Sequence, residues 1–324
     1  MPFTAKSGKF NASINTVEFG TGDKAVKIGG ENVFPLYSFD AAIENAPKVG
    51  IEITDFGMEH EPECIKKYYE GCATLADMAR KAASMEGVDF LSFRMEGGDP
   101  NGANKSTEEL IGELKEIADA VDLPLVVCGC KNVEKDAELF SKAAEALNGK
   151  NAVILSAKEE NYKTVGAAAG LAYKQIVGAE SAVDINLAKQ LNVLISQLGV
   201  DSKSVVMNVG SAAVGYGFEY VISTMDRVKA AALQQGDANL QMPIITPVAS
   251  EAWGVKEAMA SETDAPEWGS QEERGIDMEV ETAMAVIAAG SNAVILKHPE
   301  SIKIISGERI SLRVALRRRC NYGT

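Results

Sequence analysis

Short apolar runs alternate with longer amphipathic segments along most of the chain, from residue 49 onward. The apolar runs are rich in Val, Ile, Leu and Phe and nearly continuous in hydrophobicity, as strands buried on both faces are. Eight such runs predict eight strands, at residues 49–54, 88–94, 124–128, 152–156, 182–185, 204–208, 243–246 and 292–297.

The intervening segments have the three-to-four-residue apolar spacing of helices that pack on a sheet. These predicted helices are residues 62–85, 107–120, 133–147, 161–177, 187–198, 217–235, 276–289 and 300–318. Eight strand–helix units indicate an α/β protein with a (β/α)8 barrel rather than an open doubly wound sheet. No Gly-x-Gly-x-x-Gly sequence follows the first strand, which argues against a dinucleotide-binding fold.

Residues 1–48 precede this pattern and form an N-terminal extension. Within it, two short apolar runs at 17–19 and 25–28 flank a Gly-Thr-Gly-Asp turn, which predicts a β-hairpin. We therefore expect an extension at 1–48, whose hairpin covers the bottom of the barrel, and a barrel at 49–324.

The composition is that of a soluble globular protein: of 324 residues, 46% are hydrophobic and 24% are charged. The formal net charge of −14 argues against nucleic acid or an anionic membrane as a partner. We find neither a run of ~20 apolar residues that would span a membrane nor a signal peptide at the start of the chain. The five cysteines form no disulfide framework, which favours a cytoplasmic location.

Ligands for a tightly held metal are scarce. The chain has two histidines, His60 and His298, and no Cys-x-x-Cys pair, so the ligand spacing of a four-cysteine iron–sulfur cluster or a structural zinc is missing. The Asp-x-His-x-x-Gly pattern that ligates a corrinoid and a Walker-type phosphate loop are missing as well. We therefore expect any metal chemistry to depend on a partner.

In a barrel, functional groups lie on the loops that follow the strands, and the loop after 204–208 is unusual. It runs from Asn208 through Gly210, Gly215, Tyr216 and Gly217 into a predicted helix. Its glycines allow close backbone approach to a ligand, the helix start offers free amide donors, and Tyr216 offers a flat face. A Gly-rich turn with Tyr216 packed in the core explains the same residues equally well.

The connection after the seventh strand, residues 247–275, is far longer than the usual βα loop of about two to six residues. It contains both tryptophans, Trp253 and Trp268, together with Glu251 and Glu257, and we expect a helix near 255–261. Exposed tryptophans supply much of the binding energy at interfaces and over flat ligands. We expect a partner interface or a lid here; the simpler alternative is that each tryptophan fixes its own loop to the barrel rim.

Other candidates have simpler structural explanations. Lys297 suits a Schiff base only if desolvation lowers its pKa, and an ion pair is its more common state. Glu96 and Asp99 suit acid–base or cation chemistry, but acidic residues are common on barrel rims. Asp184 and Asn208 suit hydrogen bonding to a pterin-like ring, although loop capping explains them as well.

A run of short motifs extends from Asn208 to Glu257. They are Gly215-Tyr-Gly-Phe-Glu-Tyr220, Met225-Asp-Arg227, Ala230-Ala-Ala-Leu233, Met242-Pro-Ile244, Glu251-Ala-Trp253 and Lys256-Glu257. These motifs resemble a signature of the small subunit of the corrinoid iron–sulfur protein, a family that includes the delta subunit of the archaeal acetyl-CoA decarbonylase/synthase complex. Gly29-Gly30-Glu31 and Phe34-Pro35 near the start are similar too, so the resemblance covers the whole chain and is strongest to the bacterial form.

The resemblance implies a (β/α)8 barrel in a heterodimer with a larger subunit that carries a [4Fe–4S] cluster and a corrinoid-binding domain. The corrinoid is expected between the two subunits, over the carboxyl ends of the barrel strands. The pair would accept a methyl group from methyltetrahydrofolate through a methyltransferase and pass it to acetyl-CoA synthase, in the reductive acetyl-CoA pathway. The chain itself would be a carrier subunit without catalytic residues. Barrel position and residue type predict its corrinoid contacts: Asn208, Gly210, Gly215, Tyr216, Gly217, Glu251 and Trp253.

Two enzymes remain as alternatives on the same barrel. A pterin-dependent methyltransferase would bind methyltetrahydrofolate through Asp184 and Asn208, and a tight pterin complex of the isolated chain would support it. An aldolase would use Lys297 or Lys158, although no sequence feature favours one. For a carrier, replacing Trp253 or Tyr216 by alanine should weaken corrinoid retention or subunit pairing and leave the barrel folded.

Overall fold

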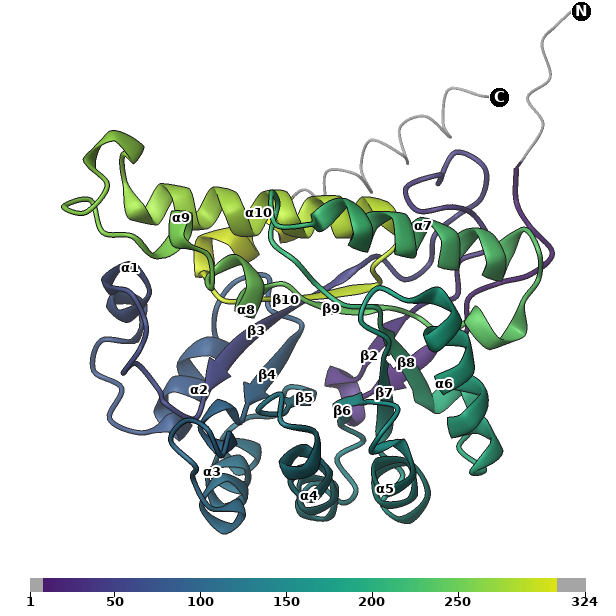
Figure 1. The fold of residues 1–324 in the computed structure, drawn as a ribbon, viewed down its shortest axis with the longest axis horizontal. Helices are drawn as coiled ribbons and strands as arrows, with labels where there is room; N and C mark the ends of the chain where they lie inside the picture. Colours follow the sequence, from purple (N-terminus) through teal and green to yellow (C-terminus); the bar gives the residue numbers. More distant parts are fainter. Residues whose placement is uncertain (1–7, 308–324) are drawn as a thin grey trace, which may run out of the picture.

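The computed structural model describes residues 8–307, and its centre is a ring of eight parallel strands (Figure 1). The strands are β3 (Lys48–Thr54), β4 (Phe90–Arg94), β5 (Leu125–Cys128), β6 (Val153–Ala157), β7 (Ile176–Glu180), β8 (Val205–Asn208), β9 (Ile245–Pro247) and β10 (Ala293–Leu296). Their order is β8-β7-β6-β5-β4-β3-β10-β9, and a parallel bridge between Met207 and Ile244 joins the two ends. The predicted (β/α)8 barrel is therefore confirmed.

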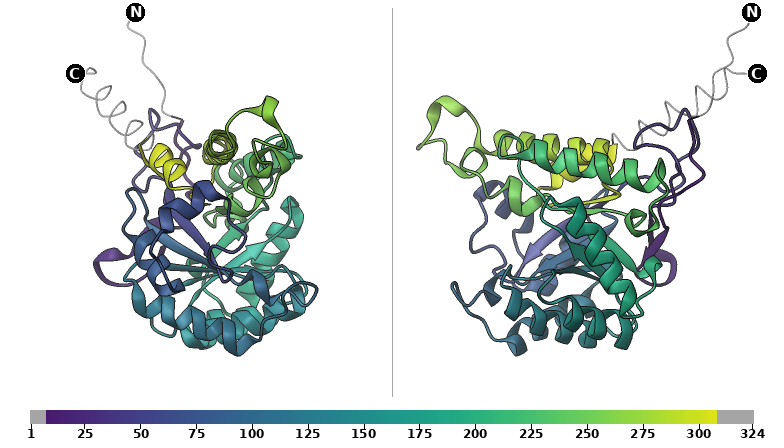
Figure 2. Two further views of the ribbon diagram at one scale, coloured as in Figure 1. Left: turned by 90° about the vertical axis from the view of Figure 1, so that its left-hand side faces the viewer. Right: turned by 45° about the vertical axis from the view of Figure 1, so that its right-hand side comes forward.

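Helices surround the strands on the outside, as both views of Figure 2 show. The α-helices are α1 (Glu63–Lys66), α2 (Leu75–Ala83), α3 (Thr107–Ala120), α4 (Val133–Ala146), α5 (Tyr162–Val165), α6 (Ile185–Gln197), α7 (Phe218–Leu233), α8 (Ala249–Ala252), α9 (Lys256–Met259) and α10 (Gln271–Ala289). The 3-10 turns are η1 (Gly22–Lys24), η2 (Lys67–Tyr69), η3 (Glu96–Gly98), η5 (Ser202–Ser204), η6 (Ala238–Leu240) and η7 (Pro266–Trp268), and η4 (Gly166–Ala172) is a π-helix. Side-chain caps start several helices; for example, Ser106 accepts a hydrogen bond from the Glu109 amide at 3.1 Å. None of the helices described between residues 8 and 307 is long and apolar enough to span a membrane.

The predicted strand at 182–185 is wrong, because the strand in this part of the chain is β7, which ends before residue 182. The predicted helix at 161–177 is helical through α5 and η4 and ends at Ala172. Ala182 and Val183 adopt φ values of +44° and +60°, which belong to a turn rather than to a strand. Ile176 and Val177 continue the apolar spacing of the preceding helix, so the pattern concealed the change of element.

The long helix predicted at 62–85 is also wrong, because α1, η2 and α2 divide this segment. Gly71 has a φ of +83°, a left-handed conformation that ends the helical path. Thr74 and Asp77 then form a capping box that starts α2. In the last predicted helix, residues 299–307 are helical, and 308–318 lie outside the described residues.

The N-terminal hairpin closes the bottom of the barrel, as predicted. Strand β1 (Val17–Phe19) pairs antiparallel with β2 (Val26–Ile28), and both strands bury their apolar residues at the amino ends of the barrel strands. The Phe19 ring lies 5.5 Å from the Phe90 ring in an edge-to-face arrangement. Gly50 on β3 leaves the room for Phe90, since a Cβ at this position would lie 2.1 Å from the ring. The hairpin thus closes the amino end of the barrel with apolar side chains, and the opposite, carboxyl end stays open for a ligand.

Candidate functional site

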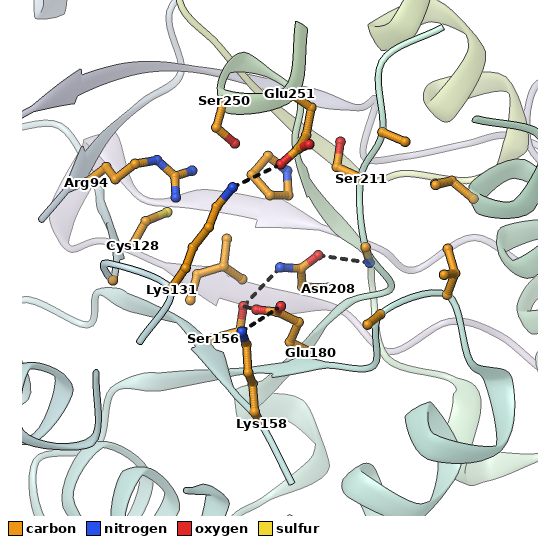
Figure 3. A pocket seen from close by; sticks show the side chains of 18 of the residues that line it. Arg94, Cys128, Lys131, Ser156, Lys158, Glu180, Asn208, Ser211, Ser250 and Glu251 are labelled. Carbon is orange, nitrogen blue, oxygen red and sulfur yellow. Dashed lines mark hydrogen bonds and ion pairs between the residues drawn. The ribbon is translucent and has the colours of Figure 1, made fainter. Parts of the chain in front are cut away.

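A pocket of about 450 Å³ opens at the carboxyl ends of the strands (Figure 3). Its floor is formed by polar residues at the ends of successive strands: Arg94 on β4, Cys128 on β5, Ser156 on β6, Glu180 on β7 and Asn208 on β8. Its rim includes Lys131, Lys158, Val183, Gly210, Ser211, Tyr216, Gly217, Tyr220, Ser250 and Glu251. The pocket is therefore in the position where barrel proteins carry their functional groups.

The floor is a connected hydrogen-bond network. The Asn208 side-chain amide donates to Ser156 Oγ at 3.0 Å, and its oxygen accepts from the Gly210 amide at 3.1 Å. Ser156 Oγ in turn donates to Glu180 Oε2 at 3.2 Å. Asn208 and Ser156 are buried, so these bonds fix their orientation before any ligand binds.

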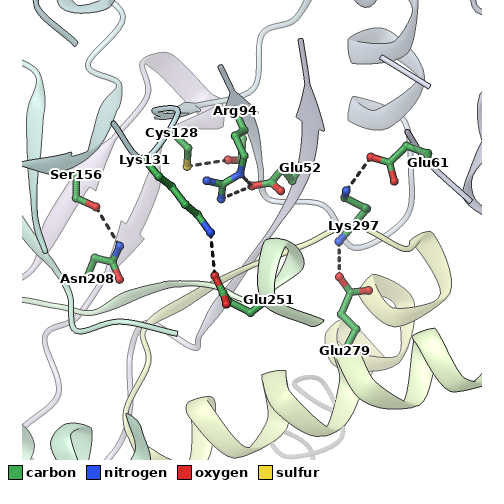
Figure 4. A network of polar contacts seen from close by, with 11 residues as sticks. Glu52, Glu61, Arg94, Cys128, Lys131, Ser156, Asn208, Glu251, Glu279 and Lys297 are labelled. Carbon is green, nitrogen blue, oxygen red and sulfur yellow. Dashed lines mark hydrogen bonds and ion pairs between the residues drawn. The ribbon is translucent and has the colours of Figure 1, made fainter. Parts of the chain in front are cut away.

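Three ion pairs place positive and negative groups at or beside the pocket in equal numbers; two of them, Arg94–Glu52 and Lys131–Glu251, are shown in Figure 4. Arg94 contacts Glu52 at 2.8 Å inside the barrel, and Lys158 contacts Glu180 at 3.4 Å. Burial lowers the pKa of Arg94, but the Glu52 carboxylate more than offsets this effect and keeps the pKa above its ordinary value. The pairs thus offer N–H donors and carboxylate acceptors together without adding a net charge.

The third ion pair crosses the mouth of the pocket. Lys131 follows β5, and its side chain reaches over the pocket to Glu251 on α8, at 3.2 Å (Figure 3). Lys131 has a φ of +71°, a left-handed conformation that only a minority of non-glycine residues adopt. The pair joins two opposite walls of the barrel, and both residues remain partly exposed.

The glycine-rich loop after β8 presents a tyrosine at the rim. Gly215 and Gly217 have φ values of +87° and +79°, and the turn between them holds Tyr216 with 50% of its surface exposed. The alternative in which Tyr216 packs in the core is therefore wrong. The Tyr216 hydroxyl donates to Glu257 Oε2 on α9 at 2.5 Å, and this bond raises the pKa of Tyr216. Tyr216 and Gly217 line the pocket, whereas Gly215 does not.

The structure contradicts the expectation that both tryptophans lie on an exposed loop. Trp253 is 5% exposed and stacks on His298 with ring centroids 5.8 Å apart. Gly275 on α10 packs against the six-membered ring of the indole, since a Cβ there would lie 2.2 Å from it. Trp253 therefore joins α8 to α10 and does not line the pocket, as the simpler alternative proposed. The segment 247–275 folds into α8, α9 and η7, and α9 confirms the helix expected near 255–261.

Two further candidates, Lys297 and Asp184, have structural partners. Lys297 contacts Glu61 at 2.7 Å, and although burial lowers its pKa, the Glu61 carboxylate holds the pKa above the ordinary value (Figure 4). Lys297 is therefore a protonated ion-pair partner, which argues against a Schiff base at this residue. Asp184 caps α6 by accepting from the amides of Asn186 and Leu187 at 2.8 and 3.2 Å.

Sequence reasoning missed several polar residues in the floor and next to it. Glu52 and Arg94 stand inside buried strands, and a charged residue in an otherwise apolar run was the signal that pointed to them. Glu180 was missed because the strand that carries it was placed too late in the sequence. Ser156 gave no signal, since a serine at a strand end is common.

The described part of the chain shows no ready-made metal site at the pocket. Residues 8–307 hold no cluster of three or more His, Cys, Asp or Glu side chains arranged around a common point. Cys128 lines the pocket, but burial raises the pKa of its thiol to about 11, which keeps it protonated at neutral pH. His298 is fully buried beneath Trp253 and does not reach the pocket.

His298 is expected to make stability depend on pH. Burial and the Lys67 cation lower the pKa of His298 to about 4, against the opposing carboxylates of Glu272 and Glu300. A histidine in the unfolded chain titrates near pH ~6.5. As pH falls, the unfolded chain therefore takes up this proton before the folded chain does. The stability that neutral His298 contributes is consequently lost as pH falls from about 6.5 toward 4. We expect the difference in unfolding free energy between wild type and His298→Asn to shrink over this range in urea titrations. A difference that stays constant with pH would contradict the assignment.

Residues 16–316 match the model of the CO dehydrogenase/acetyl-CoA synthase delta subunit family. The delta subunit of the acetyl-CoA decarbonylase/synthase complex of Methanothermobacter thermautotrophicus is 31% identical over 299 residues, which are 91% of this chain and 75% of that protein. Delta subunit 1 from Methanosarcina thermophila is 30% identical over 293 residues, or 88% of this chain. The chain spans 66% of the length of this Methanosarcina relative.

Solved structures with a similar barrel include dihydropteroate synthases. The enzyme from Thermus thermophilus in complex with 4-aminobenzoate has a TM-score of 0.54 at 12% identity, covering 91% of this chain and 99% of that one. The enzyme from Vibrio fischeri has a TM-score of 0.53 at 10% identity, covering 93% and 98%. At such identities the likeness concerns the barrel fold alone. The family match, in contrast, extends over both the hairpin and the barrel, and the chain belongs to the CO dehydrogenase/acetyl-CoA synthase delta subunit family.

Proposed function

We propose that this chain is a carrier subunit that covers a corrinoid held jointly with a larger, iron–sulfur-containing subunit. The proposal rests on one observation in this member of the family. Its barrel mouth is open and carries ion pairs with equal numbers of positive and negative groups, and the floor of the mouth is a fixed hydrogen-bond network. The methyl group would arrive from methyltetrahydrofolate through a separate methyltransferase and leave to acetyl-CoA synthase. The two-subunit protein would work in the cytoplasm.

The pocket residues fit a corrinoid. Such a macrocycle is broad and flat, and its edge carries neutral carboxamides that need both donors and acceptors. The balanced ion pairs supply both, and a phosphate-rich ligand would instead call for an excess of cations. Ser211 Oγ is buried at the pocket wall without a hydrogen-bond partner, which leaves it free for an amide of the ligand. Tyr216 and Tyr220 add exposed aromatic faces beside it.

The residues of this chain would bind and orient the ligand rather than react with it. When bound, the corrinoid supplies a cobalt centre that accepts and gives up a methyl group. Asn208 and Glu180 present fixed polar groups to the ligand, and Tyr216 covers its edge and excludes water. No described histidine lines the pocket, and its Cys128 thiol is protonated, so these residues would hold the corrinoid without binding its cobalt strongly.

An anaerobic pull-down of the tagged chain from its native host, followed by an absorption spectrum, tests the proposal. We expect a larger partner together with corrinoid and iron–sulfur bands. A colourless lone protein that binds methyltetrahydrofolate would overturn the carrier function and favour the pterin-dependent methyltransferase. The structure gives that alternative less support, because Asp184 already uses its carboxylate to cap α6.

Tyr216 provides the residue-level prediction. We expect Tyr216→Ala to speed corrinoid loss from the two-subunit protein by about tenfold, because it removes an aromatic face from the pocket wall. Tyr37→Ala is the matched control, since Tyr37 is 46% exposed but lies on the N-terminal extension, outside the pocket. Corrinoid release is followed by absorbance after dilution. Equal release from the two variants would show that Tyr216 does not contact the ligand.

A further inference from the structure

The turn between β7 and α6 has a backbone conformation that its residues do not favour. Ala182 and Val183 have φ values of +44° and +60°, and the Asp184 amide donates to the Ser181 carbonyl oxygen at 3.1 Å. Tight turns with two left-handed central residues are normally built from glycine and asparagine. In a β-branched residue such as Val183, the left-handed conformation crowds Cβ against the backbone. We call residues 181–184 the strained turn.

Neighbouring elements hold the strained turn in place. The Val183 amide donates to the Val209 carbonyl oxygen at 2.7 Å. The Thr224 hydroxyl on α7 donates to the Val183 carbonyl oxygen at 3.1 Å, and Thr224 is buried. Both polar backbone groups of Val183 therefore have partners on other parts of the chain. Contacts of this kind, rather than local preference, keep a residue in a conformation that it does not favour.

Positive φ values outside glycine are concentrated at the pocket. Within residues 8–307, seven residues other than glycine have a positive φ, and three of them line the pocket: Lys131, Ala182 and Val183. Two of the other four are asparagines, which adopt this conformation more readily. Val183 is the only β-branched residue among these seven described residues. Backbone strain that the surrounding structure maintains commonly accompanies a binding or catalytic role, and here the least favourable of these conformations lies in the pocket wall.

The strained turn presents an apolar side chain at the pocket. Val183 is 41% exposed, and it lines the pocket together with the exposed side chains of Tyr216 and Tyr220. The Thr224 hydroxyl lies 3.1 Å from the Val183 carbonyl oxygen and 2.8 Å from that of Tyr220, so the turn and the start of α7 are neighbours. We call the side chains of Val183, Tyr216 and Tyr220 the apolar lip. The pocket thus combines an apolar lip with the ion pairs and the polar floor described above.

We propose that the strained turn positions the corrinoid, with the Val183 side chain in contact with an apolar part of the macrocycle. The inference rests on the proposed function. A corrin ring carries methyl groups beside its carboxamides, and ligand pockets commonly combine apolar walls with a few fixed polar groups. Covering the exposed isopropyl group stabilises the complex, and a side chain whose backbone is already held loses little entropy on binding. Val183 is therefore a positioning residue that takes no part in methyl transfer.

The test compares two measurements on the same variants: the urea midpoint of the full chain and corrinoid release from the two-subunit protein. Glycine adopts a positive φ freely, so we expect Val183→Gly to raise the urea midpoint. The same variant should speed corrinoid release by about fivefold, because the isopropyl contact is lost. A residue with only a structural role would instead lower the midpoint when it is replaced. Val183→Ala removes the contact without the added freedom of glycine and should speed release to a similar extent.

Lys174→Gly is the matched control. Lys174 has a φ of +52° and is exposed, but it precedes β7 and does not line the pocket. Its replacement should also raise the urea midpoint, and corrinoid release should stay at the wild-type rate.

Three results would overturn the inference. They are a lower midpoint for Val183→Gly, wild-type release from Val183→Ala, and weaker pairing of Val183→Ala with the larger subunit at unchanged release, which would place the turn in the subunit interface. A wild-type pair that contains no corrinoid would overturn the proposed function instead, and the urea midpoints would still report the strain.

Discussion

Replacing Lys229 by methionine is expected to lower the free energy of unfolding by about 3–5 kcal/mol. Lys229 is 1% exposed, and its ammonium group donates to Glu31 Oε1 at 2.8 Å and to Asn292 Oδ1 at 3.0 Å. Burial alone would raise the pKa of Glu31, but Lys229 and the Asn292 amide hold it below the ordinary value. Without the lysine, a buried carboxylate loses its cation and must either remain unpaired or take up a proton.

Urea titration of Lys229→Met at neutral pH measures this loss. The double variant Lys229→Met/Glu31→Gln should recover much of it, because the unpaired charge is then gone. Lys189→Met is the surface control, since the Lys189–Asp237 pair is partly exposed and such pairs contribute about 1 kcal/mol or less. A loss as small for Lys229 as for Lys189 would contradict the prediction.

This cluster also connects the N-terminal extension to the barrel. Glu31 belongs to the N-terminal extension, Lys229 to α7, and Asn292 to the turn before β10. Asn292 also accepts from the Ile244 amide at 3.0 Å, which places the cluster at the amino end of the barrel. We propose that residues 8–48 are a structural part of the barrel rather than an independently stable unit.

The periodicity of the sequence was sufficient to predict the ring of strands, because each strand is buried on both faces and its apolar run is unbroken. It failed around β7, where Ile176 and Val177 extend the spacing of a preceding helix of small residues. In that segment, the change from helix to strand is set by packing between neighbouring strands, such as Val177 opposite Val205, and not by local preference.

For the candidate site, too, some residues could be predicted from the local sequence and others could not. Asn208 and Tyr216 were predictable because a polar or glycine-rich segment directly after a strand must lie at the barrel mouth. The surroundings of Trp253 were not, because they depend on Gly275, which is distant in sequence and leaves room for the indole only after α10 has packed. The Lys131–Glu251 pair likewise joins residues from opposite walls, a contact that no local pattern contains.

The second large effect is expected at Trp253. From the sequence, replacing this residue by alanine was expected to leave the barrel folded, but its burial in the structure predicts a loss of stability. Trp253→Ala should lower the free energy of unfolding by about 3–5 kcal/mol, because it empties the space between His298 and Gly275 in the core. Corrinoid loss from this variant would then be a consequence of instability. Tyr216→Ala, at an exposed position, should change the unfolding free energy by less than ~0.5 kcal/mol.

Urea titrations of the two variants beside corrinoid-release measurements separate these roles. Trp253→Phe keeps a ring in the cavity and should recover part of the unfolding free energy that Trp253→Ala loses. If Trp253 instead acted on the ligand directly, Trp253→Ala would speed corrinoid release without lowering the unfolding free energy, and there would be no stability for Trp253→Phe to recover. A stable Trp253→Ala protein that still releases its corrinoid quickly would show that the indole reaches the ligand after a rearrangement. Because Trp253 follows Glu251 by two residues, its packing against α10 also holds in place the residue that pairs with Lys131 across the pocket mouth.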